Sequence, residues 1–184
     1  MLGSLPKTLT ISDREIPIDS NYRTALLCME ACNDPDLSDA EKKYLLMDLI
    51  IGIDKLKTEE YEEALQKIVW FLDCGKEFDG HHEKKAMDWQ QDEQMIFSAV
   101  NKVAGKETRE EKYIHWWTWM GYFSEIGEGL FSTVVSIRVK KNRGEKLTDA
   151  EKGFYRKNRK LVDIQKKYSQ EEQKEMDELN RMLG

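Results

Sequence analysis

Proline and cysteine are scarce in this chain, and each scarcity narrows what the chain can form. The only three prolines among the 184 residues lie within the first 35 positions. Because proline is the strongest helix breaker, helices can form anywhere in the rest of the chain. Cys28, Cys32 and Cys74 are an odd number of cysteines without the spacing of a disulfide framework. We therefore expect a helix-rich intracellular protein.

Two kinds of apolar segment are also missing. No run of about 18 apolar residues is present, so no membrane-spanning segment is predicted. The first ten residues, MLGSLPKTLT, lack the charged start and apolar centre that are typical of a signal peptide. Both observations favour a protein that is neither secreted nor inserted in a membrane.

No group of residues has the spacing of a catalytic or metal-binding motif. Structural zinc sites use recurring short pairs of ligands. The candidates here are one cysteine, two adjacent histidines and a distant third histidine: Cys74, His81, His82 and His115. The segment Gly127-Glu-Gly129 lacks the other residues of a phosphate-binding loop. We therefore expect no catalytic, cofactor or metal site, and no enzyme.

What the chain does have is charge, unevenly distributed. The net charge is −6, yet residues 138–160 contain ten Lys or Arg against three Asp or Glu. Residues 161–184 contain four Lys or Arg against six Asp or Glu. Such asymmetry indicates charge-guided contact with a partner, or head-to-tail contact between copies of the chain.

The sequence predicts a mainly α fold, a compact multi-helix domain with a small N-terminal β-hairpin. Residues 8–11 and 15–18 are short β-rich runs, so residues 1–18 are expected to form a hairpin that packs on the helices. Residues 19–160 are the predicted helical domain, and residues 161–184 a charged C-terminal helical tail. Capping boxes, typical of helix starts, are predicted at Ser38/Glu41, Thr108/Glu111, Thr148/Glu151 and Ser169/Glu172.

The aromatic stretch at residues 112–141 is the predicted packing centre, because large aromatic side chains bury the most apolar area. One helical face is expected to carry most of this core, through Tyr113, Trp116, Trp117, Met120 and Phe123. Trp119 falls off that face. We therefore expect Trp119 to be exposed and to anchor an interface.

Two further groups are candidates for partner binding. The basic group consists of Arg138, Lys140, Lys141, Arg143 and Arg156. The C-terminal group consists of Met176, Leu179 and Leu183, an apolar stripe too thin for a core helix. That tail is expected to be frayed or docked on another chain. The basic segment also permits a nucleic-acid role, although the whole protein is acidic and shows no known binding motif.

Residues 131–139 are ambiguous from their pattern alone. Phe131, Thr133, Val135, Ile137 and Val139 alternate with mostly polar residues, which is typical of a strand. The same segment also fits a helix, with its apolar face at Leu130, Val134 and Ile137. The alternation leans toward a strand, but no neighbouring strand offers itself as a partner.

Three segments in succession carry a family resemblance. They are DWQQDEQMIFSAV at residues 88–100, IHWWTWM at residues 114–120, and Ile137-Arg138 with the basic run after it. In this order, over about residues 20–160, the chain resembles small proteins of tailed phages and prophages of Gram-positive bacteria. Those proteins are encoded upstream of the tape-measure gene and are taken to be tail assembly chaperones. Residues 127–131 and the tail after Arg159 do not match the pattern.

The resemblance implies a fold and a role. It implies a helix at residues 131–139, and a non-enzymatic protein in the cytoplasm of the bacterial host. The implied partners are the tape-measure protein and the tail tube protein, and copies of the chain could form a homo-oligomer. No membrane is expected as a partner. Nucleic acid is not favoured either, and a nucleic-acid-associated phage protein acting through residues 138–160 is the alternative.

Overall fold

The predicted mainly α fold with an N-terminal hairpin is confirmed in a computed structural model. The structure describes residues 3–76 and 84–183, except for the side chain of Leu183. The described part forms a two-stranded sheet, nine α-helices and three short 3-10 helices. In chain order they are β1 Thr8–Ile11, β2 Arg14–Pro17, α1 Tyr22–Cys32, α2 Asp39–Ile50, η1 Ile53–Lys55, η2 Thr58–Glu60, α3 Tyr61–Leu72, α4 Glu93–Ala104, η3 Thr108–Glu110, α5 Trp116–Ser124, α6 Leu130–Arg143, α7 Asp149–Lys157, α8 Arg159–Val162 and α9 Gln170–Leu183.

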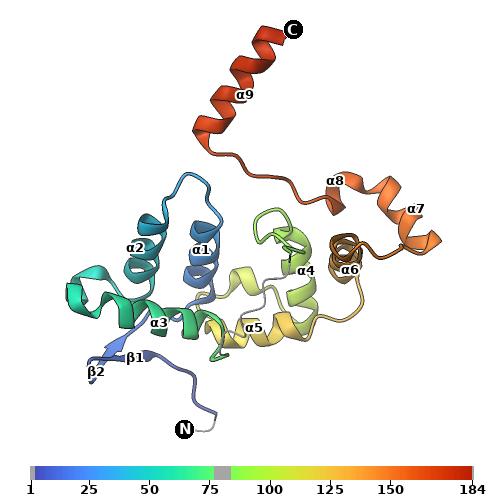
Figure 1. The fold of residues 1–184 in the computed structure, drawn as a ribbon. Helices are drawn as coiled ribbons and strands as arrows, with labels where there is room; N and C mark the ends of the chain where they lie inside the picture. Colours follow the sequence, from blue (N-terminus) through green and yellow to red (C-terminus); the bar gives the residue numbers. More distant parts are fainter. Residues whose placement is uncertain (1–2, 77–83, 184) are drawn as a thin grey trace.

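The helices form one body from which α9 projects (Figure 1). Helix α1 packs against α2 and α5, α4 packs against α5 and α6, and the short α8 joins α7 to α6. The helices α7 and α8 therefore form the end of the body farthest from α2 and α3 (Figure 1). No helix in residues 3–76 or 84–183 is both long and apolar enough to cross a membrane.

The hairpin is closed by a two-residue turn and packs on α3. Ser12 and Asp13 both have positive φ angles, 46° and 59°, as tight hairpin turns require. The strands pair antiparallel with Leu9 opposite Ile16, and both side chains are buried. The backbone N–H of Ser12 donates to Glu63 of α3 at 3.0 Å. The hairpin thus packs on α3.

Three of the four predicted capping boxes are present, at Ser38, Thr148 and Ser169. The prediction at Thr108 was wrong. Thr108 is buried and its hydroxyl donates to Asn101 at 2.7 Å, so it joins a short 3-10 turn to the end of α4. The next helix, α5, begins only at Trp116, where the ring of His115 accepts from the Trp117 N–H at 3.1 Å.

The late start of α5 changes which aromatic side chains form the core. Trp116 and Trp119 are fully buried, whereas Trp117 is half-buried and Tyr113 is 48% exposed. The predictions of an exposed Trp119 and of a core face through Tyr113 and Trp117 were therefore wrong. Five rings surround the Trp119 indole with centroids at 5.7–6.0 Å: Tyr22, Trp89, Phe97, Trp116 and Phe123. Trp119 is the centre of the core.

The two neighbouring tryptophans complete the end of α3. The indole N–H of Trp116 donates to the Leu72 carbonyl at 2.8 Å, and that of Trp117 donates to the Phe71 carbonyl at 2.8 Å. Carbonyls in the last turn of a helix have no partner within the helix. The His-Trp-Trp segment thus stabilises α3 as well as starting α5.

Residues 131–139 lie within α6, as the resemblance implied and against the strand-like alternation. The buried residues of this helix, Phe131, Val134, Ile137 and Arg138, are spaced at i, i+3, i+6 and i+7 and share one face. The helix ends at Gly144, whose φ of 71° is the left-handed conformation typical of a C-terminal cap.

Candidate functional site

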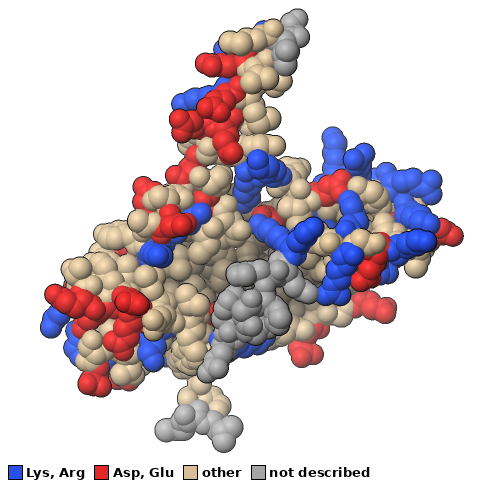
Figure 2. All heavy atoms as spheres, in the orientation of Figure 1, with Lys and Arg blue, Asp and Glu red and all other residues tan. Residues whose placement is uncertain are grey.

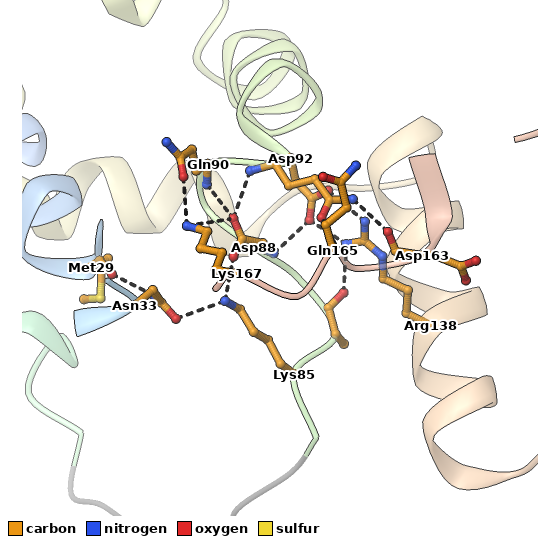
Figure 3. A network of polar contacts seen from close by, with 12 residues as sticks. Met29, Asn33, Lys85, Asp88, Gln90, Asp92, Arg138, Asp163, Gln165 and Lys167 are labelled. Atoms are coloured by element: carbon orange, nitrogen blue, oxygen red, sulfur yellow. Dashed lines mark hydrogen bonds and ion pairs between the residues drawn. The ribbon is translucent and has the colours of Figure 1, made fainter. Parts of the chain in front are cut away.

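Arg138 is the most highly connected side chain among the residues predicted to bind a partner. It donates to both carboxylate oxygens of Asp92, with Nη1–Oδ2 at 2.5 Å and Nη2–Oδ1 at 2.9 Å (Figure 3). It also donates to three backbone carbonyls, those of Ala86 at 3.2 Å, Leu161 at 2.9 Å and Val162 at 2.6 Å. Both members of the ion pair are buried, with exposed side-chain fractions of 4% and 0%.

The prediction that Arg138 binds a partner was therefore wrong. It lies on the buried face of α6, where its guanidinium joins α8 and the segment before α4 to the body. A planar group with five donors suits such a junction, because a single side chain satisfies several acceptors at once.

Asp88 organises the turn that places Asp92 opposite Arg138. One oxygen of Asp88 accepts from the backbone N–H groups of Gln90 and Gln91, at 3.0 and 2.9 Å. The other accepts from the Lys85 ammonium at 2.6 Å, and the Asp88 N–H donates to Asp92 at 2.9 Å (Figure 3). Burial alone would raise the pKa of Asp88, but the bonds from Lys85 and Gln91 hold it below its ordinary value.

The linker between α8 and α9 is bound along the body. The side-chain amide of Gln91 donates to the Asp163 carbonyl at 3.0 Å and accepts from the Gln165 N–H at 2.9 Å. Lys167 donates to Gln90 at 2.8 Å. At the start of α9, the Gln170 N–H donates to Asp36 of the α1–α2 loop at 2.7 Å. The contacts with Gln90 and Gln91 and the contact with Asp36 therefore hold the base of α9 beside the α1–α2 loop.

The four other basic candidates divide into two groups. Lys140 pairs with Glu151 at 2.6 Å, and Lys141 pairs with Asp163 at 2.5 Å. The contact with Lys140 is the largest of the interactions that lower the pKa of Glu151 to about 2. Arg143 and Arg156 are exposed. Lys140 and Lys141 thus pair with carboxylates of the C-terminal segment, and Arg143 and Arg156 lie on the surface.

The predicted apolar stripe of the tail lies on the exposed helix α9. Met176 and Leu179 have exposed fractions of 40% and 59%. The side chain of Leu183, the third member of the predicted stripe, lies outside the described residues. The expectation that this stripe is not part of the core agrees with these exposures.

An apolar groove between α1 and α4, which we name the α1–α4 groove, has no counterpart among the predicted sites. Its volume is about 470 Å³. Apolar side chains form most of its lining: Tyr22, Leu26, Leu27, Trp89, Ile96, Phe97 and Trp119. Leu27 is 51% exposed there. The signal that was missed is the adjacent pair Leu26-Leu27, because neighbouring helix side chains point roughly 100° apart, so a helix that turns one of them toward the body can leave the other at its edge.

Two arginines lie at the α1–α4 groove and are held by the body. Arg23 donates to the backbone carbonyls of Glu111 at 2.7 Å and Arg109 at 2.6 Å, and it lies 5.0 Å from the centre of the Tyr22 ring. Arg109 pairs with Glu107 at 2.8 Å and lies 5.2 Å from the centre of the Phe97 ring. Both cations are therefore positioned before a ligand arrives.

Trp119 contributes a buried indole to the lining of the groove. Within the described ranges, its indole N–H is the one buried side-chain donor or acceptor that has no hydrogen-bond partner. Buried polar groups nearly always have a hydrogen-bond partner, so an unpaired buried donor is unusual. Apart from this buried N–H, the polar part of the lining consists of two arginines, two glutamates and one glutamine: Arg23, Arg109, Glu30, Glu93 and Gln90.

The residues considered for zinc are only partly described. His81 and His82 lie outside the described residues. Both ring nitrogens of His115 have protein partners, the Pro6 carbonyl at 2.8 Å and the Trp117 N–H. In the ranges that the structure describes, no three His, Cys, Asp or Glu side chains are grouped closely enough to hold a metal ion.

The contacts of His115 predict a dependence of stability on pH. Nδ1 accepts from Trp117, so Nε2 carries the proton and donates to Pro6. Burial lowers the pKa of His115 below its ordinary value, although the Pro6 contact opposes the shift. The neutral ring therefore stabilises the fold fully above the unfolded pKa of about 6.5, and this contribution is lost as the pH falls through the folded pKa.

His115→Asn tests this expectation, because asparagine also caps helices and does not titrate. Urea unfolding between pH 7.5 and pH 5 should show a smaller loss of stability for the variant than for the unchanged chain. Equal losses in the two proteins would show that His115 does not contribute to the pH dependence.

The fold is a helical body with a buried arginine anchor and an open groove. These features do not identify a chemical reaction. A model described as "Bacteriophage Gp15 protein" matches residues 1–164. The chain is therefore a phage protein, and it belongs to the bacteriophage Gp15 family. No curated protein and no solved structure gives a significant match to the chain. Helix α9 lies beyond the matched residues.

Proposed function

We propose that the chain is a non-enzymatic tail assembly chaperone that binds the tape-measure protein, the tail tube protein, or both, in the cytoplasm of the bacterial host. The observation that carries the proposal is the open α1–α4 groove on a member of a phage family. The resemblance of residues 20–160 to tail assembly chaperones supports the same role.

The lining of the groove is suited to binding the apolar face of a partner's amphipathic helix. Amphipathic helices bind in such grooves through apolar side chains spaced at i, i+3 or i+4, and i+7. Leu27 provides exposed apolar contact area. Arg23 and Arg109 can receive carboxylates that flank an apolar stripe, and Glu30 and Glu93 can receive flanking cations. A long tape-measure helix repeats such stripes along its length, so many copies of a weak binder would cover it.

Leu27→Glu is the sharpest test of the groove. It places a charge at the mouth of an apolar site, where burial of an unpaired carboxylate opposes binding. We expect capture of the tape-measure protein from the same phage to weaken by about tenfold or more, which corresponds to ~1.4 kcal/mol. The measurement is co-expression with a tagged tape-measure protein, followed by titration of the purified chains.

Leu130→Glu is the matched control, because Leu130 is also 51% exposed but lies at the start of α6 and does not line the groove. It should leave capture unchanged, and both variants should keep the melting temperature of the unchanged chain. Equal capture by the Leu27 and Leu130 variants would remove the groove from the proposal. If the unchanged chain forms no complex with the tape-measure protein, the proposed chaperone role is wrong.

The second candidate function is binding of nucleic acid through residues 138–160. One observation favours it: Arg156, Lys157 and Lys160 are exposed and pair with no carboxylate of the described chain. This hypothesis predicts retardation of DNA or RNA that weakens steeply with added salt. No retardation at low salt would exclude it.

A further inference from the structure

The carboxylates of α9 have no cationic partner among the described residues of the body. Residues 170–183 contain five Asp or Glu and two Lys or Arg. Among the described residues, no ion pair joins an α9 side chain to any other element. Glu171, Glu175 and Glu178 follow one another at i, i+4 and i+7, so they share one side of the helix. This side of α9 is an acidic ridge.

An apolar stripe lies on the same helix. Met176 and Leu179 are 40% and 59% exposed, and Figure 1 shows α9 projecting from the body. A stripe this narrow does not hold a helix in isolation, because short helices in water gain most of their stability from packing. A surface that stabilises α9 would therefore combine positive charge with some apolar contact area.

The body has such a surface at its α7–α8 end. Arg156, Lys157 and Lys160 are exposed there, and no carboxylate among the described residues pairs with them. Lysine and arginine side chains are concentrated at this end of the molecule in Figure 2. Phe154, half-buried on α7, and the aliphatic parts of the basic side chains provide apolar contact area. We name the three cations the α7–α8 basic surface.

The linker keeps α9 away from the α7–α8 basic surface of its own chain. Its contacts through Gln91, Lys167 and Gln170 hold the base of α9 at the α1–α2 loop. In Figure 1 the linker runs from α8 across the body to this point, where α9 projects from the body apart from α7. The acidic helix and the basic surface thus lie apart in one chain, so a contact between them in this arrangement would join two copies.

We propose that α9 of one copy docks on the α7–α8 basic surface of a second copy. The acidic ridge pairs with Arg156, Lys157 and Lys160, and the apolar stripe packs beside Phe154. The two contacting surfaces differ, so the contact is head-to-tail and each added copy leaves one free α9 and one free basic surface. Opposite charges on the two surfaces give the contact its specificity and make it weaken as salt rises.

Charge reversal tests the contact in the full-length chain. The first variant combines Glu171→Lys, Glu175→Lys and Glu178→Lys, and it keeps Glu172 because that residue caps α9 with Ser169. The second combines Arg156→Glu, Lys157→Glu and Lys160→Glu. Sedimentation velocity at about 50 mM salt should show association of the unchanged chain, and each variant alone should associate about tenfold or more weakly.

Mixing the two variants makes the test specific. Each alone presents two surfaces of like charge, whereas a mixture brings opposite charges together again, so association should return to near that of the unchanged chain. A matched control, Lys43→Glu with Lys67→Glu and Lys102→Glu, changes the net charge as much as the second variant does at exposed positions elsewhere. This control should associate like the unchanged chain.

Three results would overturn the proposal. They are a monomeric unchanged chain at low salt, association of both variants at the unchanged strength, and a mixture that stays dissociated. If the second variant loses binding to DNA while the unchanged chain stays monomeric, the basic surface serves nucleic acid instead. These outcomes do not depend on the tape-measure protein, so they can fail or succeed separately from the proposed chaperone function.

Discussion

Replacing Arg138 with methionine is expected to lower the free energy of unfolding by about 3–5 kcal/mol, the usual cost of removing one partner from a buried ion pair. The substitution leaves the Asp92 carboxylate buried without its cation, and the carbonyls of Ala86, Leu161 and Val162 without their donor. In a chain of this length the melting temperature should fall by roughly 10 °C. Urea unfolding followed by circular dichroism measures the change directly.

Lys141→Met is the matched control, because Lys141 also pairs with an aspartate at 2.5 Å but 36% of its side chain is exposed. Exposed ion pairs contribute little, so this variant should lose less than about 1 kcal/mol. The double variant Arg138→Met with Asp92→Leu should recover part of the loss, since it removes the unpaired charge. An Arg138→Met protein as stable as the Lys141→Met protein would contradict the role of Arg138 as an anchor.

Replacing Trp119 with alanine is expected to cost about 3–5 kcal/mol, as large-to-small changes in a packed core do. Trp119 has no exposed surface, and five aromatic rings surround it within 6.0 Å. The variant should unfold at a lower urea concentration, and it should also alter the α1–α4 groove that Trp119 lines.

Trp70→Ala is the comparison for this prediction. Trp70 also contacts another tryptophan, with its ring centroid 5.3 Å from that of Trp117, but it is 39% exposed. Its loss should cost clearly less than the loss of Trp119. Similar costs for the two variants would mean that the aromatic cluster is not centred on Trp119.

The sequence predicted the helical class and the starts of α2, α7 and α9 because those features depend on neighbouring residues. Ser38 with Glu41 and Thr148 with Glu151 form the boxes that their spacing predicts. Trp119 was assigned to the wrong environment because the helix register was judged from apolar spacing over residues 113–123. The cap at His115, which sets the true start of α5, is an unusual residue for that position.

The candidate site was harder to predict because its parts are distant in sequence. Arg138 pairs with a carboxylate 46 positions away, and nothing local to residues 138–160 distinguishes it from the exposed basic residues around it. The α1–α4 groove combines residues near position 25 with residues near positions 95 and 109. Only the tertiary packing of α1 on α5, and of α5 on α4, brings them together.

The arginine anchor and the proposed binding surfaces have separate roles. The Arg138–Asp92 pair fixes α6, α8 and the start of α4 relative to one another, and the linker contacts extend that fixed arrangement to the base of α9. The α1–α4 groove and the α7–α8 basic surface are then presented on a rigid body. Substitutions at the anchor should therefore weaken both proposed contacts through loss of folding, whereas Leu27→Glu and the charge reversals should weaken one contact each.

The most direct test of the chaperone role is the mass of the complex that forms when the chain and the tape-measure protein of the same phage are co-expressed. Native mass spectrometry of the purified complex should give several copies of the chain for each tape-measure molecule, and fewer copies with Leu27→Glu. A complex of one copy each, or no complex at matched expression, would contradict the proposal that the protein acts by covering a long partner with its surface.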